Sequence, residues 1–192
     1  MEALLASTGV VALAEIGDKT QLLAFLLAAR FKKPLPIIAG ILVATIVNHS
    51  LAGAVGAWIS ASVPPAALRL VLGLSFIGMA IWTLIPDKIE SGEGDAARRF
   101  GVFGATLVTF FLAEMGDKTQ IATVVLAAHY AMPVAVVIGT TLGMLIADVP
   151  AVFLGDNLAG RIPLRIVHSF AAAIFALLGI AALLGAGEGI GL

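Results

Sequence analysis

Acidic, basic and amide side chains recur in a nine-residue pattern that the chain contains twice. The copies occupy residues 13–21 and 112–120 and differ only at Ile16 and Met115. Their chemically active residues are Glu15, Asp18, Lys19, Thr20 and Gln21, then Glu114, Asp117, Lys118, Thr119 and Gln120. Both copies lie inside long apolar runs. Inserting one charge into a membrane there costs roughly 2.5–3.5 kcal/mol, so the pattern is a candidate functional site.

The donors in the two copies favour a hard divalent cation. On a continuous helix the Glu and Asp of one copy share a face, and the Lys can reach the same Glu. Carboxylate and amide oxygens are the ligands that Ca2+, Mn2+ and Mg2+ prefer. Four carboxylates and two ammonium groups leave a charge of about -2 at neutral pH. We predict metal binding by Glu15, Asp18, Gln21, Glu114, Asp117 and Gln120, with Lys19 and Lys118 balancing charge.

The same carboxylates have the chemistry that a metal/proton exchanger needs. Carboxylates held close together repel one another, so some of them should bind protons when the metal leaves. Gly17 and Gly116, inside the two copies, permit either close helix approach or local unwinding that frees backbone carbonyls. Both alternatives remain open from the sequence.

Composition indicates an integral membrane protein. The 192-residue chain is 60% hydrophobic and 12% charged, whereas soluble domains are about 25% charged. Its mean hydropathy is +1.10. The chain has no cysteine, which excludes disulfides and thiolate metal sites. The N-terminus lacks the basic start and cleavage site of a signal peptide, so we expect its first apolar segment to be retained.

Six apolar runs predict an all-α membrane protein with six transmembrane helices. They begin near residues 3, 35, 64, 101, 133 and 163. Each can supply the roughly 20 residues that a spanning helix needs. The first and fourth runs carry the two copies of the pattern near their middles.

The two halves of the chain align without a gap at an offset of 99 residues. Pro34 then falls on Pro133, and Gly40 falls on Gly139. Because each half holds three spans, the second should cross the membrane in the opposite sense, which gives two inverted three-helix repeats. Secondary transporters have this architecture, with sites near the midplane between repeats. The predicted units are residues 1–86, a connecting loop at 87–100, and residues 101–192.

Basic residues predict the orientation in the membrane. The connections after the first, third and fifth spans hold Arg30, Lys32, Lys33, Lys88, Arg98, Arg99, Arg161 and Arg165. Such clusters mark the cytoplasmic side. We therefore expect a multi-pass protein of the cell inner (plasma) membrane, with a cytoplasmic 87–100 loop and both termini outside.

Three further polar residues lie inside predicted spans. Asn48 and His49 lie near the middle of the second span, where they can act as ligands or as hydrogen-bonding contacts between helices. Asp148 lies in the fifth span, at the position that matches His49. Since a carboxylate is costly in a membrane, we predict that Asp148, with Asn48 and His49, belongs to an ion or proton path.

The doubled Glu-x-Gly-Asp-Lys-Thr motif in a six-span chain resembles the manganese/calcium transporter family of Golgi, thylakoid and bacterial membranes, within the cation/calcium exchanger superfamily. The resemblance covers essentially the whole chain. It implies cation/proton antiport, with export of Mn2+ as the bacterial role and Ca2+ as the other candidate substrate. It also implies metal binding at Glu15, Asp18, Glu114 and Asp117.

Functions other than metal/proton exchange are also compatible with parts of the sequence. A passive divalent-cation channel or uniporter would use the same carboxylates. An intramembrane hydrolase with paired acids would need a nucleophile that the sequence does not offer, so no enzyme activity is expected. No phosphate-binding GxxxxGK[ST] motif occurs, and no nucleic-acid partner or cofactor besides the transported ion is expected. A neutralised Glu–Lys packing contact is the structural alternative.

Overall fold

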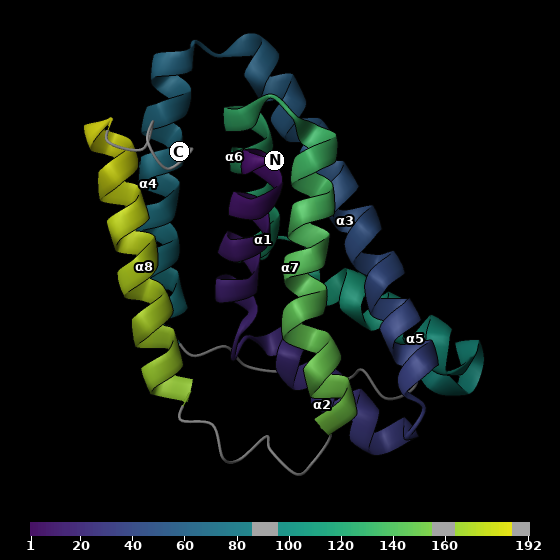
Figure 1. The fold of residues 1–192 in the computed structure, drawn as a ribbon. Helices are drawn as coiled ribbons and strands as arrows, with labels where there is room; N and C mark the ends of the chain where they lie inside the picture. Colours follow the sequence, from purple (N-terminus) through teal and green to yellow (C-terminus); the bar gives the residue numbers. More distant parts are fainter. Residues whose placement is uncertain (86–95, 155–163, 186–192) are drawn as a thin grey trace.

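The computed structural model describes residues 1–85, 96–154 and 164–185, and these residues form eight α-helices (Figure 1). They are α1 (Glu2–Glu15), α2 (Lys19–Phe31), α3 (Pro34–Ser62), α4 (Pro65–Thr83), α5 (Ala96–Glu114), α6 (Lys118–Tyr130), α7 (Pro133–Leu154) and α8 (Leu164–Leu184). The described ranges contain no β-strand. The all-α prediction is therefore confirmed for these residues. Most of the predicted 87–100 loop lies outside them.

Four of the helices, α3, α4, α7 and α8, are long and apolar enough to cross a membrane. The pair α5–α6 satisfies the same test as one span bent by 69°. The helices α1 and α2 have 14 and 13 residues. At 1.5 Å per residue each is about 20 Å long, which is short of a hydrocarbon core of about 30 Å. The described residues thus contain four or five candidate spans, and a sixth requires that α1 and α2 cross together.

The first and fourth predicted spans are not continuous helices. Each is broken at the recurring pattern, between Glu15 and Lys19 in one half and between Glu114 and Lys118 in the other. The expectation that Glu, Asp and Lys share one helical face is therefore wrong. The glycine of each copy supplies the physical reason, described below.

Helix boundaries repeat between the two halves. Helices α2 and α6 each end at a residue with left-handed backbone, Lys32 with φ 51° and Ala131 with φ 50°. Pro34 and Pro133 then begin α3 and α7, because proline fits the first turn of a helix. Corresponding helices run in opposite directions in Figure 1: α3 against α7, and α4 against α8.

Packing between the halves is reciprocal. Helix α1 packs on α7, and its counterpart α5 packs on α3. Helices α4 and α8 pack on each other at one side of the molecule (Figure 1). There the rings of Phe76 and Phe175, which are 99 residues apart, stack with centroids 6.3 Å apart. Each half therefore completes the packing of the other.

Two equivalent glycines allow close contacts between these helices. A Cβ atom on Gly139 would lie 2.5 Å from the backbone oxygen of Leu4, and one on Gly40 would lie 2.7 Å from Cβ of Thr106. Gly139→Ala should therefore separate α7 from α1 and lower the unfolding free energy by about 1–3 kcal/mol. The measurement is the thermal midpoint in detergent.

Gly9→Ala in α1 is the matched control, because nothing lies within 4 Å of a Cβ at that position. Alanine also favours a helix over glycine by about 1 kcal/mol. Equal losses of thermal stability in the two variants would contradict the close-contact explanation.

Candidate cation site

The Gly-Asp step of each copy ends one helix and starts the next. Gly17 has φ 84° and Gly116 has φ 75°, in the left-handed region that glycine enters without a Cβ clash. Asp18 and Asp117 then occupy the N-cap positions of α2 and α6, which aspartate favours. The side chain of Asp117 accepts a hydrogen bond of 2.8 Å from the backbone N–H of Lys118.

Glutamine side chains support both breaks in the same way. The Oε1 atom of Gln21 accepts a hydrogen bond of 2.8 Å from the backbone N–H of Gly17, and Gln120 accepts one of 2.8 Å from Gly116. Gln21 also donates through Nε2 to the carbonyl of Ala147 in α7, at 3.0 Å. The oxygens predicted to bind metal thus hold the backbone of the break, and metal binding by the two glutamines stays a prediction.

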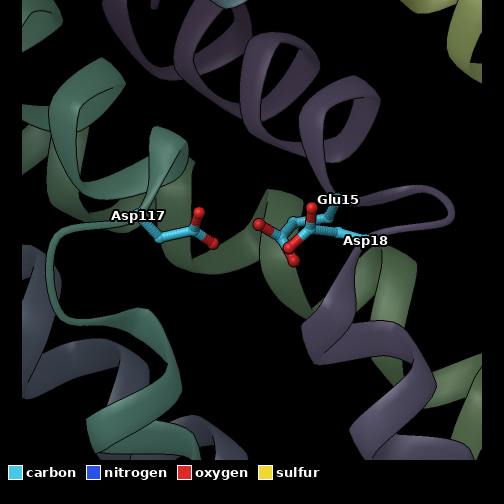
Figure 2. Close-up of side chains that lie close together, drawn as sticks. All are labelled: Glu15, Asp18 and Asp117. Atoms are coloured by element: carbon cyan, nitrogen blue, oxygen red, sulfur yellow. The ribbon is translucent and has the colours of Figure 1, made fainter. Parts of the chain in front are cut away.

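Three carboxylates meet between the two breaks. One oxygen from each of Glu15, Asp18 and Asp117 lies within 4.8 Å of the others, and all three side chains are buried. Figure 2 shows the carboxylates facing one another, with Glu15 and Asp18 from one break and Asp117 from the other. Buried carboxylates this close repel one another, so their ionised forms require compensating positive charge. We call these three residues the carboxylate cluster.

Glu114, the fourth predicted carboxylate, is not one of the three residues of the carboxylate cluster. It is fully buried, and its Oε2 atom is 3.5 Å from Nε2 of His49 in α3. Neither of its oxygens has a hydrogen-bond partner among the described residues. The structure therefore brings three of the four predicted carboxylates together and pairs the fourth with a histidine.

The lysines contact carboxylates of the opposite half. Lys118 forms an ion pair with Asp18, and Nζ of Lys19 lies 3.6 Å from Oδ1 of Asp117. The prediction that each lysine reaches the Glu of its own copy requires an unbroken helix and is wrong. Because the backbone turns at the glycine, the lysine points across to the other break. The two pairs link the halves of the chain.

The other predicted polar residues lie on α3 and α7. Asn48 donates from Nδ2 to the backbone oxygen of Phe111 in α5 at 3.1 Å, a contact between helices. Asp148 is fully buried, and its two oxygens have no hydrogen-bond partner in the described parts of the chain. Its carboxyl group lies near enough to those of Glu15 and Glu114 for their charges to influence one another. Asp148 therefore belongs to the same buried charge system as both motif glutamates.

Two contacts extend the site beyond the predicted residues. Thr20, which is not among the predicted metal ligands, donates its hydroxyl hydrogen to Glu15 Oε2. His168 of α8 places Nε2 3.2 Å from the carbonyl oxygen of Gly17. Nothing in the sequence marks His168, because the position equivalent to it in the first half is Arg69. Helix α8 thus contacts the first break directly.

Apolar helices, buried carboxylates at two helix breaks and lysines paired across the halves are the features of a multi-pass membrane protein with a candidate cation site. A family model described as divalent cation/proton antiporter GDT1 matches the chain twice, at residues 3–91 and 102–189. The chain belongs to this family. It is therefore a membrane transporter and not an enzyme.

Relatives match over nearly the whole chain. A Vibrio cholerae protein named "Putative manganese exporter" is 49% identical over 94% of this chain and 90% of its own length. "GDT1-like protein 3" of Oryza sativa subsp. indica is 32% identical over 91% of this chain and 71% of its own. "GDT1-like protein 5" of Arabidopsis thaliana is 28% identical over 93% of both chains. No solved structure gives a significant match.

Proposed function

We propose that this chain exports Mn2+ in exchange for protons, through a midplane site that both copies of the motif build. The observation that carries the proposal is the carboxylate cluster, in which Asp117 comes from one break and Glu15 and Asp18 come from the other. A site shared by two halves can open to one side or the other when the halves move against each other. That is the mechanism of alternating access in repeat-built transporters.

The proposed architecture has six spans in two inverted repeats, residues 1–86 and 101–192. Opposed directions of α3 and α7 support it, as does the repetition of helix boundaries (Figure 1). Helices α1 and α2 form the sixth span in this proposal, broken as α5 and α6 are. Exposed Arg30, Lys32 and Lys33 near the α2–α3 junction favour a cytoplasmic location for that end. The termini then face outward across the inner membrane.

The cargo is proposed from ligand chemistry and from relatives. The cluster offers only oxygen donors, which suit Mn2+ and Ca2+. The name of the Vibrio cholerae relative refers to manganese, so Mn2+ is the preferred substrate and Ca2+ the second. The lysine ammonium groups already neutralise Asp18 and Asp117, so an arriving ion must displace them. This competition favours reversible binding, which transport requires.

Protons are the proposed counter-ion because carboxylates that have lost a metal repel one another until some are neutralised. Protonated carboxylates are poor ligands, so protons and metal compete for the same oxygens. Protons that enter from an acidic exterior would then release the metal on that side. Movement of the halves would carry each ligand across in turn.

We expect an imposed pH gradient to drive Mn2+ toward the acidic side of proteoliposomes that contain the purified chain. At a gradient of one pH unit and zero membrane potential, each exchanged proton supplies about 1.4 kcal/mol, which equals a tenfold ratio of Mn2+ concentrations. The Mn2+ ratio at equilibrium therefore reports the number of protons exchanged. Addition of Mn2+ should also move protons the opposite way, which a pH-sensitive dye measures.

Protein-free liposomes and liposomes with the Asp18→Asn, Asp117→Asn double variant are the controls. An Mn2+ flux that is independent of the pH gradient and is not accompanied by proton movement would exclude exchange and support a passive channel or uniporter. Absence of any divalent-cation flux would reject the proposed function as a whole.

A further inference from the structure

The two halves differ in chemistry at one buried position. His49 of α3 and Asp148 of α7 are 99 residues apart and therefore occupy equivalent places in the repeats. Both side chains are fully buried. One half thus offers nitrogen donors and the other carboxylate oxygens. A perfectly duplicated site would contain two identical groups.

The imidazole of His49 is buried, and no hydrogen bond to any described residue accounts for that burial. Neither Nδ1 nor Nε2 has a hydrogen-bond partner among the residues with described positions. The 3.5 Å between Nε2 and Oε2 of Glu114 exceeds the usual 2.7–3.2 Å or so of a direct hydrogen bond. Leaving such polar atoms unsatisfied is costly, and a bound ion is one accepted explanation for them.

The spacing of these two atoms fits adjacent ligands of one ion. Donors at right angles, each about 2.1–2.5 Å from a metal, lie about 3–3.5 Å from each other. Nε2 of His49 and Oε2 of Glu114 are 3.5 Å apart. In its neutral form the imidazole can turn a nitrogen lone pair toward the ion while Glu114 supplies an oxygen.

A nitrogen donor can distinguish Mn2+ from Ca2+, whereas oxygen donors bind both ions. Calcium takes shells made almost entirely of oxygen. First-row transition metals accept imidazole as well as carboxylate, and histidine is the commonest protein ligand for metals. A histidine beside a carboxylate therefore favours a transition metal, whereas a second carboxylate in its place would favour Ca2+.

We infer that His49 is the residue that gives this chain its preference for Mn2+ over Ca2+, by binding the ion through imidazole nitrogen together with Glu114. The inference rests on the proposed function and adds to it the basis of ion selection. His49 acts here as a ligand at the α3–α5 contact, next to the carboxylate cluster, and Asp148 is its oxygen counterpart in the other half.

The experiment measures Mn2+ and Ca2+ transport by wild type, His49→Asp and His49→Asn in proteoliposomes. His49→Asp makes the two halves alike and should raise the ratio of Ca2+ to Mn2+ transport at least about tenfold, the lower range for lost metal-site contacts. His49→Asn should weaken the apparent affinity for Mn2+ more than that for Ca2+. His129→Asp, the same change at the end of α6 and outside the site, should leave the ratio unchanged.

A spectroscopic measurement keeps the inference testable if a His49 variant fails to fold. Electron spin echo spectra of Mn2+ bound to the wild-type protein should contain nitrogen coupling from imidazole. The coupling should persist in His168→Gln, which removes the other imidazole near the helix breaks. Wild type that exchanges Mn2+ for protons but lacks this coupling, or a folded His49→Asp variant with an unchanged ion ratio, would overturn the role of His49 and leave the proposed function intact. Wild type that transports neither ion would overturn both.

Discussion

Asp18→Asn and Asp117→Asn should each lower the initial rate of Mn2+ transport by a factor on the order of 100 or more. Both side chains are buried at the meeting point of the two helix breaks. At about 4 Å and an effective dielectric constant of about 20, one pair of unit charges interacts by about 4 kcal/mol, and a divalent ion by more. Loss of one carboxylate charge therefore weakens ion binding more than the neutral contacts that asparagine retains can compensate. Uptake of radioactive Mn2+ into proteoliposomes is the measurement.

Asparagine is the appropriate replacement because it caps helices as well as aspartate does and has nearly the same shape. Folding should therefore be retained, which a single symmetric peak in size-exclusion chromatography would verify. Glu15→Gln and Glu114→Gln should reduce transport similarly. Glu2→Gln, at the start of α1 and exposed, is the matched control and should transport normally. Near-normal rates in any two of the four site variants would exclude a shared site.

Much of this site could be predicted from composition and repetition. Charges inside an apolar run are costly enough that two identical copies of Glu, Asp and Lys had to indicate function. The offset of 99 residues also made Asp148 the equivalent of His49, and both side chains are buried. These predictions needed only residue types and the repeat offset, because equivalent positions of the two halves occupy equivalent places in the fold.

The helix breaks were one of two alternatives that the sequence left open at Gly17 and Gly116, although the sequence carries their signal. Glycine commonly ends a helix and aspartate commonly begins one, so Gly17 followed by Asp18 indicates a helix break. Gln21 occupies the third position of α2, where a glutamine side chain can accept a hydrogen bond from a backbone N–H that precedes the helix, here that of Gly17. The apolar length of the run favoured one continuous span instead. Only the break turns Lys19 away from Glu15 and toward Asp117.

The different surroundings of the two copies could not be predicted, because nearly identical sequences imply identical environments. Gly17 is buried while Gly116 is exposed, and Lys118 is 2% exposed while Lys19 is 27% exposed. The neighbours that cause this difference come from distant parts of the chain, as His168 does at Gly17. In the proposed exchange mechanism such asymmetry is required, because any single state opens the site to one side.

The unequal burial of the lysines leads to the second large effect, on stability. Lys118→Met should lower the unfolding free energy by about 3–5 kcal/mol, because it leaves the Asp18 carboxylate buried without the Lys118 ammonium. In a chain of this size that corresponds to a fall of about 10 °C in Tm. Lys19→Met removes a partly exposed ammonium whose Nζ atom lies 3.6 Å from Oδ1 of Asp117, and it should lower the unfolding free energy by about 1 kcal/mol or less.

A second substitution tests whether charge is the cause. Asp18→Asn added to Lys118→Met removes both charges, so the double variant should regain most of the lost Tm while remaining inactive in Mn2+ transport. Lys118→Arg keeps the positive charge but places a broader planar group in a packed position. This variant should therefore be more stable than Lys118→Met but should still transport Mn2+ poorly. If the two lysine variants lose equal stability, or if the effects of Lys118→Met and Asp18→Asn simply add, then Lys118 does not compensate the charge of Asp18. The ammonium would then act only through packing, and the displacement of lysine by an arriving cation would have no basis.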